Sequence, residues 1–162
     1  MGVLEGIRVI EIAEALAGPY AAMLLGDLGA DVVKIERPGV GDQARAWGAR
    51  LPNGESAYFA STNRNKRSLT LNIQKEEGRA LLQSLLVSAD VLILNIPRDE
   101  SLQRAGLIWA ALHARHPRLI VASVTGYGRS GPYAGRSGYD VVAQGEAGLM
   151  ALTGTPETVP MR

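Results

Sequence analysis

Hydrophobic residues in the first part of this chain change from a strand-like run to a helix-like period and back. Residues 8–12 form a short apolar run that is typical of a buried strand. The apolar residues that follow recur at i, i+3, i+4 and i+7, on one face of a helix: Ala21, Leu24, Leu25 and Leu28. Residues 31–36 then predict a second strand, parallel to the first because the intervening helix is long enough for a crossover.

The same alternation continues along the chain. Further strands are predicted over residues 68–72, 91–94 and 119–124, and further helices over 75–88, 107–115 and 141–149. Residues 39–58 show no period and predict a long surface loop, of the kind that often carries function. We therefore expect an α/β fold, a Rossmann-like parallel sheet with helices on both faces, in one domain over residues 1–162.

Features at the predicted sheet edge favour an anionic ligand. Gly18 and Pro19 open the first helix, where free backbone N–H groups can face an anion. Arg37 follows the second predicted strand, and a guanidinium binds phosphate oxygens through two hydrogen bonds. A glycine-dense run over residues 126–138 follows the last predicted strand, so that backbone can approach a ligand there. The pattern predicts a nucleotide-like ligand.

Composition and charge limit the classes of partner. The 162 residues are 46% hydrophobic, enough for one domain with a core. Seventeen basic and 16 acidic residues give a net charge of +1, so we expect neither nucleic acid nor membrane as a partner. Cysteine is absent, which excludes a disulfide, a thiolate metal site and a thiol nucleophile. With no signal-peptide pattern or long apolar run, we expect a cytoplasmic protein. We also expect no metal site.

Five blocks of residues stand in order along the chain: 16–20, 29–39, 63–68, 117–120 and 126–140. With these blocks the chain resembles, over essentially its whole length, the N-terminal part of the family III CoA-transferases. This group includes formyl-CoA transferase and carnitine CoA-transferase. The resemblance implies transfer of CoA from an acyl-CoA to a carboxylic acid, with coenzyme A as a substrate and no covalently bound cofactor.

The resemblance also implies covalent catalysis. In this family an aspartate attacks the thioester and forms an anhydride, which divides one difficult transfer into two steps. The family's spacing would place that aspartate after Arg162, so no catalytic residue is assigned here and we expect the 162 residues alone to be inactive. By the same resemblance, the full-length protein is expected to be a homodimer.

Four residues match the family's contacts with CoA: Arg37, Leu71, Asn95 and Arg104. Arg37 is the strongest candidate, because a planar guanidinium suits the phosphates of CoA; the alternative is a solvated charge at a strand end. The family's aromatic residue and glycine are missing from residues 95–100, which leaves the register of Arg104 open. Two alternatives also stay open for the basic residues Lys66 and Arg67. They lie in a solvated turn, or they contact the phosphates of CoA.

Five residues match the acyl pocket of the family: Leu16, Trp47, Tyr58, Tyr139 and Asp140. Leu16 stands where formyl-CoA transferase has a glutamine, so we expect a larger or more apolar acyl group than formyl or oxalyl. For Trp47 and Tyr58 the alternative is packing within a long loop. For Asp140 the alternative is a helix N-cap, since an aspartate can accept hydrogen bonds from free N–H groups.

Other functions are weighed against these residues. An acyl-CoA racemase of the same superfamily carries a histidine where this chain has Tyr139, and a phenol is a poor base at neutral pH. A dinucleotide-binding module could use Glu36 as its ribose-binding acid, but the G-x-G-x-x-G motif is absent. A third possibility is a domain that only dimerises.

Overall fold

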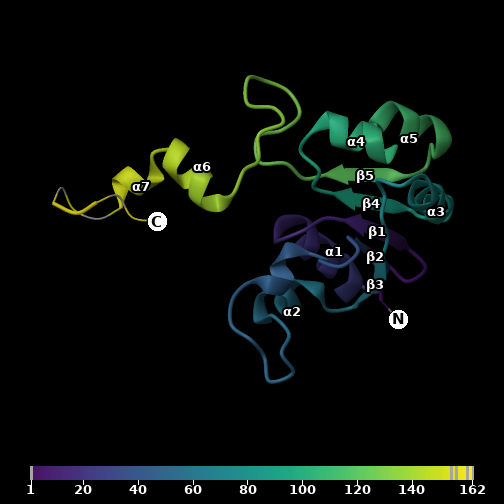
Figure 1. Cartoon of the computed structure of the whole chain (residues 1–162), viewed down its shortest axis with the longest axis horizontal. Coiled ribbons are helices and arrows are strands. Elements are labelled where there is room, and N and C mark those ends of the chain that lie inside the picture. The colour runs from purple at the N-terminus through teal and green to yellow at the C-terminus, as the bar shows by residue number, and fades with distance from the viewer. Residues whose placement is uncertain (1, 154, 156, 160, 162) are drawn as a thin grey trace. The chain divides into compact units, whose positions relative to one another are not determined.

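The computed structural model describes residues 2–153, 155, 157–159 and 161, and divides into two compact units between Val124 and Thr125. The first unit holds the whole sheet and its helices (Figure 1). Its strands are β1 (Arg8–Ile12), β2 (Asp31–Glu36), β3 (Lys66–Thr70), β4 (Val91–Leu94) and β5 (Ile120–Ser123). Its helices are α1 (Ala17–Asp27), α2 (Ala57–Asn63), α3 (Glu76–Leu86), α4 (Asp99–Ala105) and α5 (Trp109–Arg115), with a 3-10 turn η1 (Gln43–Ala46).

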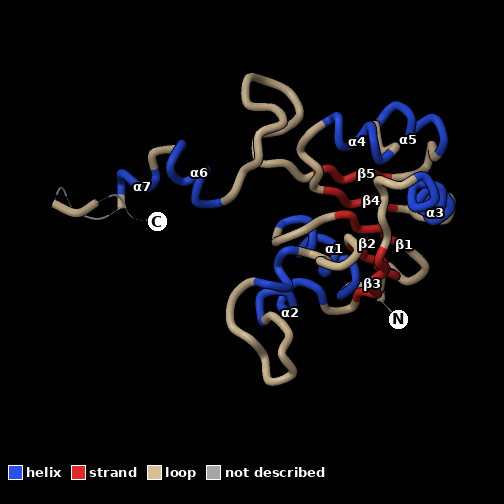
Figure 2. The backbone as a smooth tube through the Cα atoms, in the orientation of Figure 1, coloured by secondary structure: helices blue, strands red, loops and turns tan. Residues whose placement is uncertain are grey.

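All five strands are parallel, in the order β3-β2-β1-β4-β5 (Figure 2). The order reverses direction between β1 and β4, because the chain builds outward through β2 and β3 and then returns to the other side of β1. Open α/β sheets bind their ligands at the carboxyl ends of the strands, beside such a reversal. The arrangement confirms the predicted α/β class.

Side chains of neighbouring strand residues point to opposite faces, and each face carries its own helices. On one face, strand residues such as Ile10, Ile35 and Leu92 pack in a single core with α3, α4 and α5. On the other face Val9 and Val32 pack with α1. The prediction of helices on both faces is therefore confirmed.

Three elements differ from the sequence prediction. Strand β3 begins at Lys66 rather than at residue 68, so Lys66 and Arg67, for which a turn was one alternative, belong to the sheet. Helix α2, which was not predicted, begins at the end of the predicted loop, and Ser56 caps it by accepting a hydrogen bond from the Phe59 backbone N–H at 3.1 Å. Helix α4 was not predicted; it ends at Gly106, whose φ of 71° lies in the left-handed region that favours glycine.

The second unit contains two short helices, α6 (Asp140–Glu146) and α7 (Leu149–Leu152), where a single helix over 141–149 was predicted. Gly148 separates them with a φ of 77°. Arg136 stacks over the rings of Tyr127 and Tyr133 and forms an ion pair with Glu146 at 2.6 Å.

The expectation of one domain over residues 1–162 stays a prediction. No helix in the described part of the chain has the length and apolar character needed to cross a bilayer.

Replacing Gly78 in α3 with alanine is expected to destabilise the fold. A Cβ at this position would lie 2.0 Å from the Asn72 carbonyl oxygen, a backbone atom. We expect the Gly78→Ala variant to lose about 1–3 kcal/mol of unfolding free energy, measured by urea denaturation. The control Ala80→Gly, at an exposed position of the same helix, should cost only about 1 kcal/mol through helix propensity. A Gly78→Ala variant as stable as wild type would contradict the predicted clash.

Candidate functional site

An open cleft of about 470 Å³ lies beside the segment that follows β2. It is lined by Arg37, Val40, Asp42, Gln43, Arg45, Ala46, Trp47 and Arg50. Arg37 is the first residue after the carboxyl end of β2, so the cleft lies at the sheet edge where ligands of open α/β sheets bind. Two predicted site residues, Arg37 and Trp47, therefore share this cleft.

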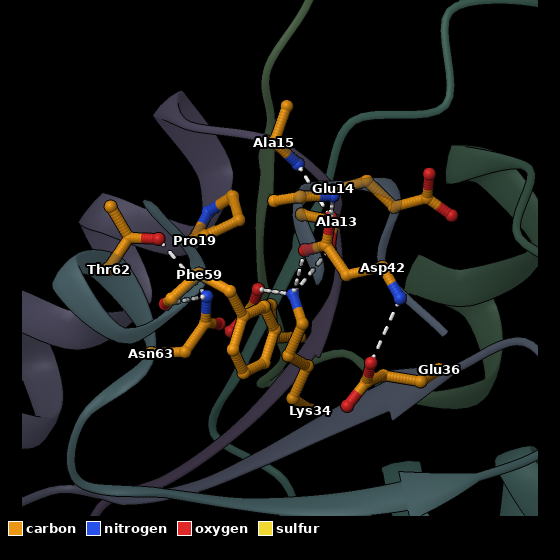
Figure 3. A network of polar contacts seen from close by, with 12 residues as sticks. Ala13, Glu14, Ala15, Pro19, Lys34, Glu36, Asp42, Phe59, Thr62 and Asn63 are labelled. Atoms are coloured by element: carbon orange, nitrogen blue, oxygen red, sulfur yellow. Dashed lines mark hydrogen bonds and ion pairs between the residues drawn. The ribbon is translucent and has the colours of Figure 1, made fainter. Parts of the chain in front are cut away.

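Six charged groups form a network on one face of the sheet and in the segment after β2, and Figure 3 shows the part of it around Lys34, Glu36 and Asp42. The three carboxylates and three cations are Glu11, Glu36, Asp42, Lys34, Arg45 and Lys66. Parallel pairing brings the strand members together, since Glu11 stands opposite Lys34 in register. Within this network the charges balance, which is the condition under which buried ions are tolerated.

Lys34 lies at the centre of the network and is 1% exposed. Its Nζ contacts Glu11 Oε1 at 2.6 Å, the Ala13 carbonyl oxygen at 2.7 Å and Asp42 Oδ2 at 2.9 Å. The first two of these contacts are hydrogen bonds, whereas the contact with Asp42 Oδ2 is an ion pair, since this buried oxygen accepts no hydrogen bond from the described residues. Lys34 thereby ties β1, the loop after β1 and the loop after β2 to one point.

Lys66 is the second buried ammonium. Its Nζ contacts Glu11 Oε2 at 2.8 Å, the Pro19 carbonyl oxygen at 2.8 Å and Asn63 Oδ1 at 2.9 Å. Burial lowers the pKa of Lys66, and the attraction of Glu11 opposes that shift. Neither alternative weighed from the sequence describes this contact set, because Lys66 holds α1 and α2 to the sheet.

Glu36 accepts four hydrogen bonds and is 5% exposed. Arg45 donates two of them, both at 2.7 Å, while Ser68 Oγ donates at 2.6 Å and the Asp42 N–H at 2.9 Å. Burial acts to raise the pKa of Glu36, but these hydrogen bonds outweigh it and hold the pKa at about 2. A carboxylate so fully engaged is not open to a ribose hydroxyl, which disfavours the dinucleotide-binding alternative.

The network also fixes the loop between β1 and α1. Asp42 Oδ1 accepts a hydrogen bond from the Ala15 N–H at 3.1 Å, and Figure 3 shows Asp42 between this loop and Glu36. Ala15 has a φ of 69°, an uncommon conformation for a residue with a Cβ. Gly18 is buried where a Cβ would lie 2.5 Å from the Ala13 Cβ, so α1 can approach this loop closely.

Arg37 is 61% exposed at its side chain and meets Glu14 in a two-pronged ion pair. The Nε to Oε1 distance is 2.9 Å and the Nη2 to Oε2 distance is 3.2 Å. Trp47, which lines the same cleft, meets the ring of Tyr58 edge to face with centroids 5.4 Å apart. Leu16 is 50% exposed at the N-terminus of α1.

The other predicted CoA contacts do not line this cleft, although Leu71 and Asn95 are hydrogen-bonded to residues next to or paired with Arg37. The Leu71 side chain packs against the core, and its N–H donates to the Glu36 carbonyl oxygen. Asn95 uses its amide on the backbone of Glu14, accepting from the N–H at 3.1 Å and donating to the carbonyl oxygen at 2.7 Å. Arg104 on α4 lines a separate depression, together with Arg79 and Arg115.

Tyr139 and Asp140 belong to the second unit, at the start of α6. Tyr139 occupies the N-cap position and is 51% exposed. The capping role considered for Asp140 is wrong, because α6 has no side-chain cap and Asp140 is its first helical residue. Its carboxylate instead accepts a hydrogen bond from Gln144 Nε2 at 2.5 Å, one helical turn further on.

The fold and the cleft define a parallel α/β domain with a basic ligand edge, and comparison with known proteins identifies its family. The model of CoA-transferase family III matches residues 4–162, and the chain belongs to this family. The predicted family is therefore confirmed. The chain is 47% identical to the succinate–glutarate CoA-transferase of Agrobacterium fabrum, an alignment that covers 98% of this chain and 41% of that protein.

Other relatives agree. The chain is 43% identical to mouse succinyl-CoA:glutarate CoA-transferase, covering 98% of this chain and 36% of the relative. The crystal structure of a CAIB/BAIF family protein from Brucella suis is 44% identical, with a TM-score of 0.89, and matches 99% of this chain and 43% of its own. The chain thus spans about two fifths of the length of these relatives.

Removing the central cation of the network is expected to be costly. In a Lys34→Met variant the carboxylates of Glu11 and Asp42 would stay buried without their shared partner. We expect a loss of about 3–5 kcal/mol of unfolding free energy by urea denaturation. The control Arg67→Gln, which breaks an exposed ion pair with Asp31, should cost less than about 1 kcal/mol. Equal losses in the two variants would contradict a special role for the buried network.

Stability at acid pH is expected to depend on Glu36. Its pKa of about 2 in the folded state lies below the ordinary value of 4.5, so its ionised form stabilises the fold above pH 4.5. That contribution to the free energy of unfolding is lost as the pH falls toward 2. The loss reaches about 2 kcal/mol by about pH 3.

Between about pH 6 and about pH 3 the free energy of unfolding should therefore fall by about 2 kcal/mol less in a Glu36→Gln variant than in wild type. Urea unfolding at each pH measures this difference. The control Glu5→Gln, at an exposed position, should follow the wild-type curve. Parallel curves for wild type and Glu36→Gln would show that this carboxylate does not titrate as described.

Proposed function

We propose that this chain binds coenzyme A for an enzyme that transfers CoA from an acyl-CoA thioester to a carboxylic acid. Membership of CoA-transferase family III supports the reaction class. The single observation that carries the binding role is Arg37, whose exposed guanidinium stands at the carboxyl end of β2 and lines the cleft. CoA carries a pyrophosphate and a ribose phosphate, and a guanidinium can donate two hydrogen bonds to such oxygens.

The other basic residues of the cleft support the same ligand. The guanidinium of Arg45 is paired with Glu36. Arg50 donates a hydrogen bond to the carbonyl oxygen of Arg45 at 2.7 Å, which holds the charge of Arg50 at the cleft wall. A positive wall on a concave surface attracts a polyanion. Leu71, Asn95 and Arg104 remain proposed contacts for the rest of the CoA molecule.

For the acyl group we propose a short dicarboxylic acid, since the relatives named above are succinate–glutarate transferases. Leu16, Trp47 and Tyr58 would supply an apolar wall, and Leu16 offers no amide to bind a formyl or oxalyl group. Tyr139 and Asp140 remain proposed as further pocket residues. Asp140 is not proposed as the nucleophile, a role we assign to an aspartate of the longer enzyme outside residues 1–162.

In the proposed reaction that aspartate attacks the thioester carbonyl, expels CoA as a thiolate and forms an acyl anhydride. The thiolate then attacks the aspartyl carbonyl of the anhydride, which releases the donor acid as its carboxylate and leaves an enzyme–CoA thioester. In the second step the acceptor carboxylate attacks this thioester and expels the CoA thiolate, which gives a second anhydride. The thiolate attacks the acceptor's carbonyl in that anhydride, so that the new acyl-CoA forms and the aspartate carboxylate is restored. The residues described here would hold CoA through its phosphates during both steps, which keeps the thiolate close. A homodimer of the full-length enzyme and a cytoplasmic location belong to the same proposal, as does the inactivity of these 162 residues alone.

Calorimetric titration of the 162-residue chain with CoA tests the binding role. We expect binding by wild type, and about tenfold or weaker affinity for an Arg37→Ala variant, because a charge-assisted hydrogen-bonded pair is lost. The control Arg8→Ala removes an arginine at the amino end of β1 that pairs with Asp31 and should keep wild-type affinity. An absence of CoA binding, or binding of NAD in its place, would contradict the proposal.

A further inference from the structure

The ion pair between Glu14 and Arg37 occupies the group that we propose for CoA phosphate. Both carboxylate oxygens of Glu14 face Arg37 nitrogens, at 2.9 and 3.2 Å. Glu14 follows β1 and Arg37 follows the neighbouring strand β2, so the pair lies at the carboxyl edge of the sheet. A phosphate bound in bidentate fashion to Arg37 would need the donors that Glu14 now uses.

The backbone that presents Glu14 is held from two sides. Asn95, which follows β4, binds both the N–H and the carbonyl oxygen of Glu14. Asp42 binds the N–H of Ala15, the next residue, whose φ is 69°. Because this backbone is fixed at both points, the pair would separate by rotation of a side chain, either that of Glu14 or that of the exposed Arg37.

We propose that Glu14 is a specificity-determining residue that competes with the ligand for Arg37 and yields only to a phosphate. This inference rests on the proposed binding of CoA and adds an internal competitor to it. A carboxylate ligand would exchange one carboxylate for another at no gain, whereas a phosphate brings more charge and more acceptor oxygens.

The environment of Glu14 shows that its hold on Arg37 is limited. Burial raises the pKa of Glu14, and the attraction of Arg37, which acts in the opposite direction, does not cancel that shift. The guanidinium is exposed to solvent, so water screens the pair. A pair of a half-buried carboxylate and an exposed guanidinium has the strength expected of a displaceable contact.

A double-mutant cycle tests the competition, with CoA titrated into wild type, Glu14→Gln, Arg37→Ala and the double variant. If Glu14 competes for Arg37, the Glu14→Gln variant should bind CoA about two- to fivefold more tightly than wild type. In the Arg37→Ala background the same substitution should change the affinity by less than about 1.5-fold, because the contested group is gone.

Two further titrations separate competition from a general charge effect. Glu55→Gln removes a carboxylate that acts on Arg45, another residue of the cleft, and should leave CoA affinity unchanged. Pantetheine, which lacks every phosphate of CoA, should bind wild type and Glu14→Gln alike.

The outcomes separate this inference from the function on which it rests. Loss of affinity in Arg37→Ala with no gain in Glu14→Gln would overturn the competition and leave the CoA site standing. An equal gain in both backgrounds would also overturn it, since simple repulsion would explain the effect. No CoA binding by any variant would overturn both proposals.

Discussion

The contacts of the Lys34 ammonium with Glu11, Asp42 and the Ala13 carbonyl oxygen are the constraint on which the candidate ligand edge of this molecule depends. Removing a lysine and its carboxylates from water is expensive, and only complete pairing in good geometry compensates for it. Here the ammonium meets Glu11, Asp42 and the Ala13 carbonyl oxygen within 2.9 Å. A second ammonium, Lys66, shares Glu11 from the other side, so the two strands that flank β2 are joined through the same carboxylate.

These contacts connect the interior of the sheet to the cleft. Asp42 forms an ion pair with Lys34 of β2 and accepts a hydrogen bond from the Ala15 N–H in the loop between β1 and α1. Its own N–H reaches Glu36, whose carboxylate fixes Arg45 at the cleft wall. A ligand that enters the cleft therefore meets groups whose positions are set by buried charges, which lowers the entropy lost on binding.

The periodic elements could be predicted from the sequence because their signals are local. The strands β1, β2 and β4 and the helix α3 follow from apolar spacing alone, and the family follows from ordered sequence blocks. The ionic network could not be predicted, because Glu11 and Lys66 are 55 positions apart and only strand pairing shows that they meet. The alternation of polar and apolar residues that predicts a strand covers residues 68–72, whereas β3 begins with the two basic residues Lys66 and Arg67. The roles of Asn95 and Glu14 were missed for the same reason, since their contacts join the ends of different strands.

The charged residues of the sheet alternate with apolar ones, so that the two faces differ in chemistry. Glu11 and Lys34 face the network, while their neighbours Ile10, Ile12 and Ile35 face the aliphatic core. Sliding one strand by a single residue would carry an ion into hydrocarbon and a hydrocarbon among ions. Misaligned pairings during folding are thus penalised on both sides of the sheet at once. The buried charges therefore help to select the correct alignment of the strands.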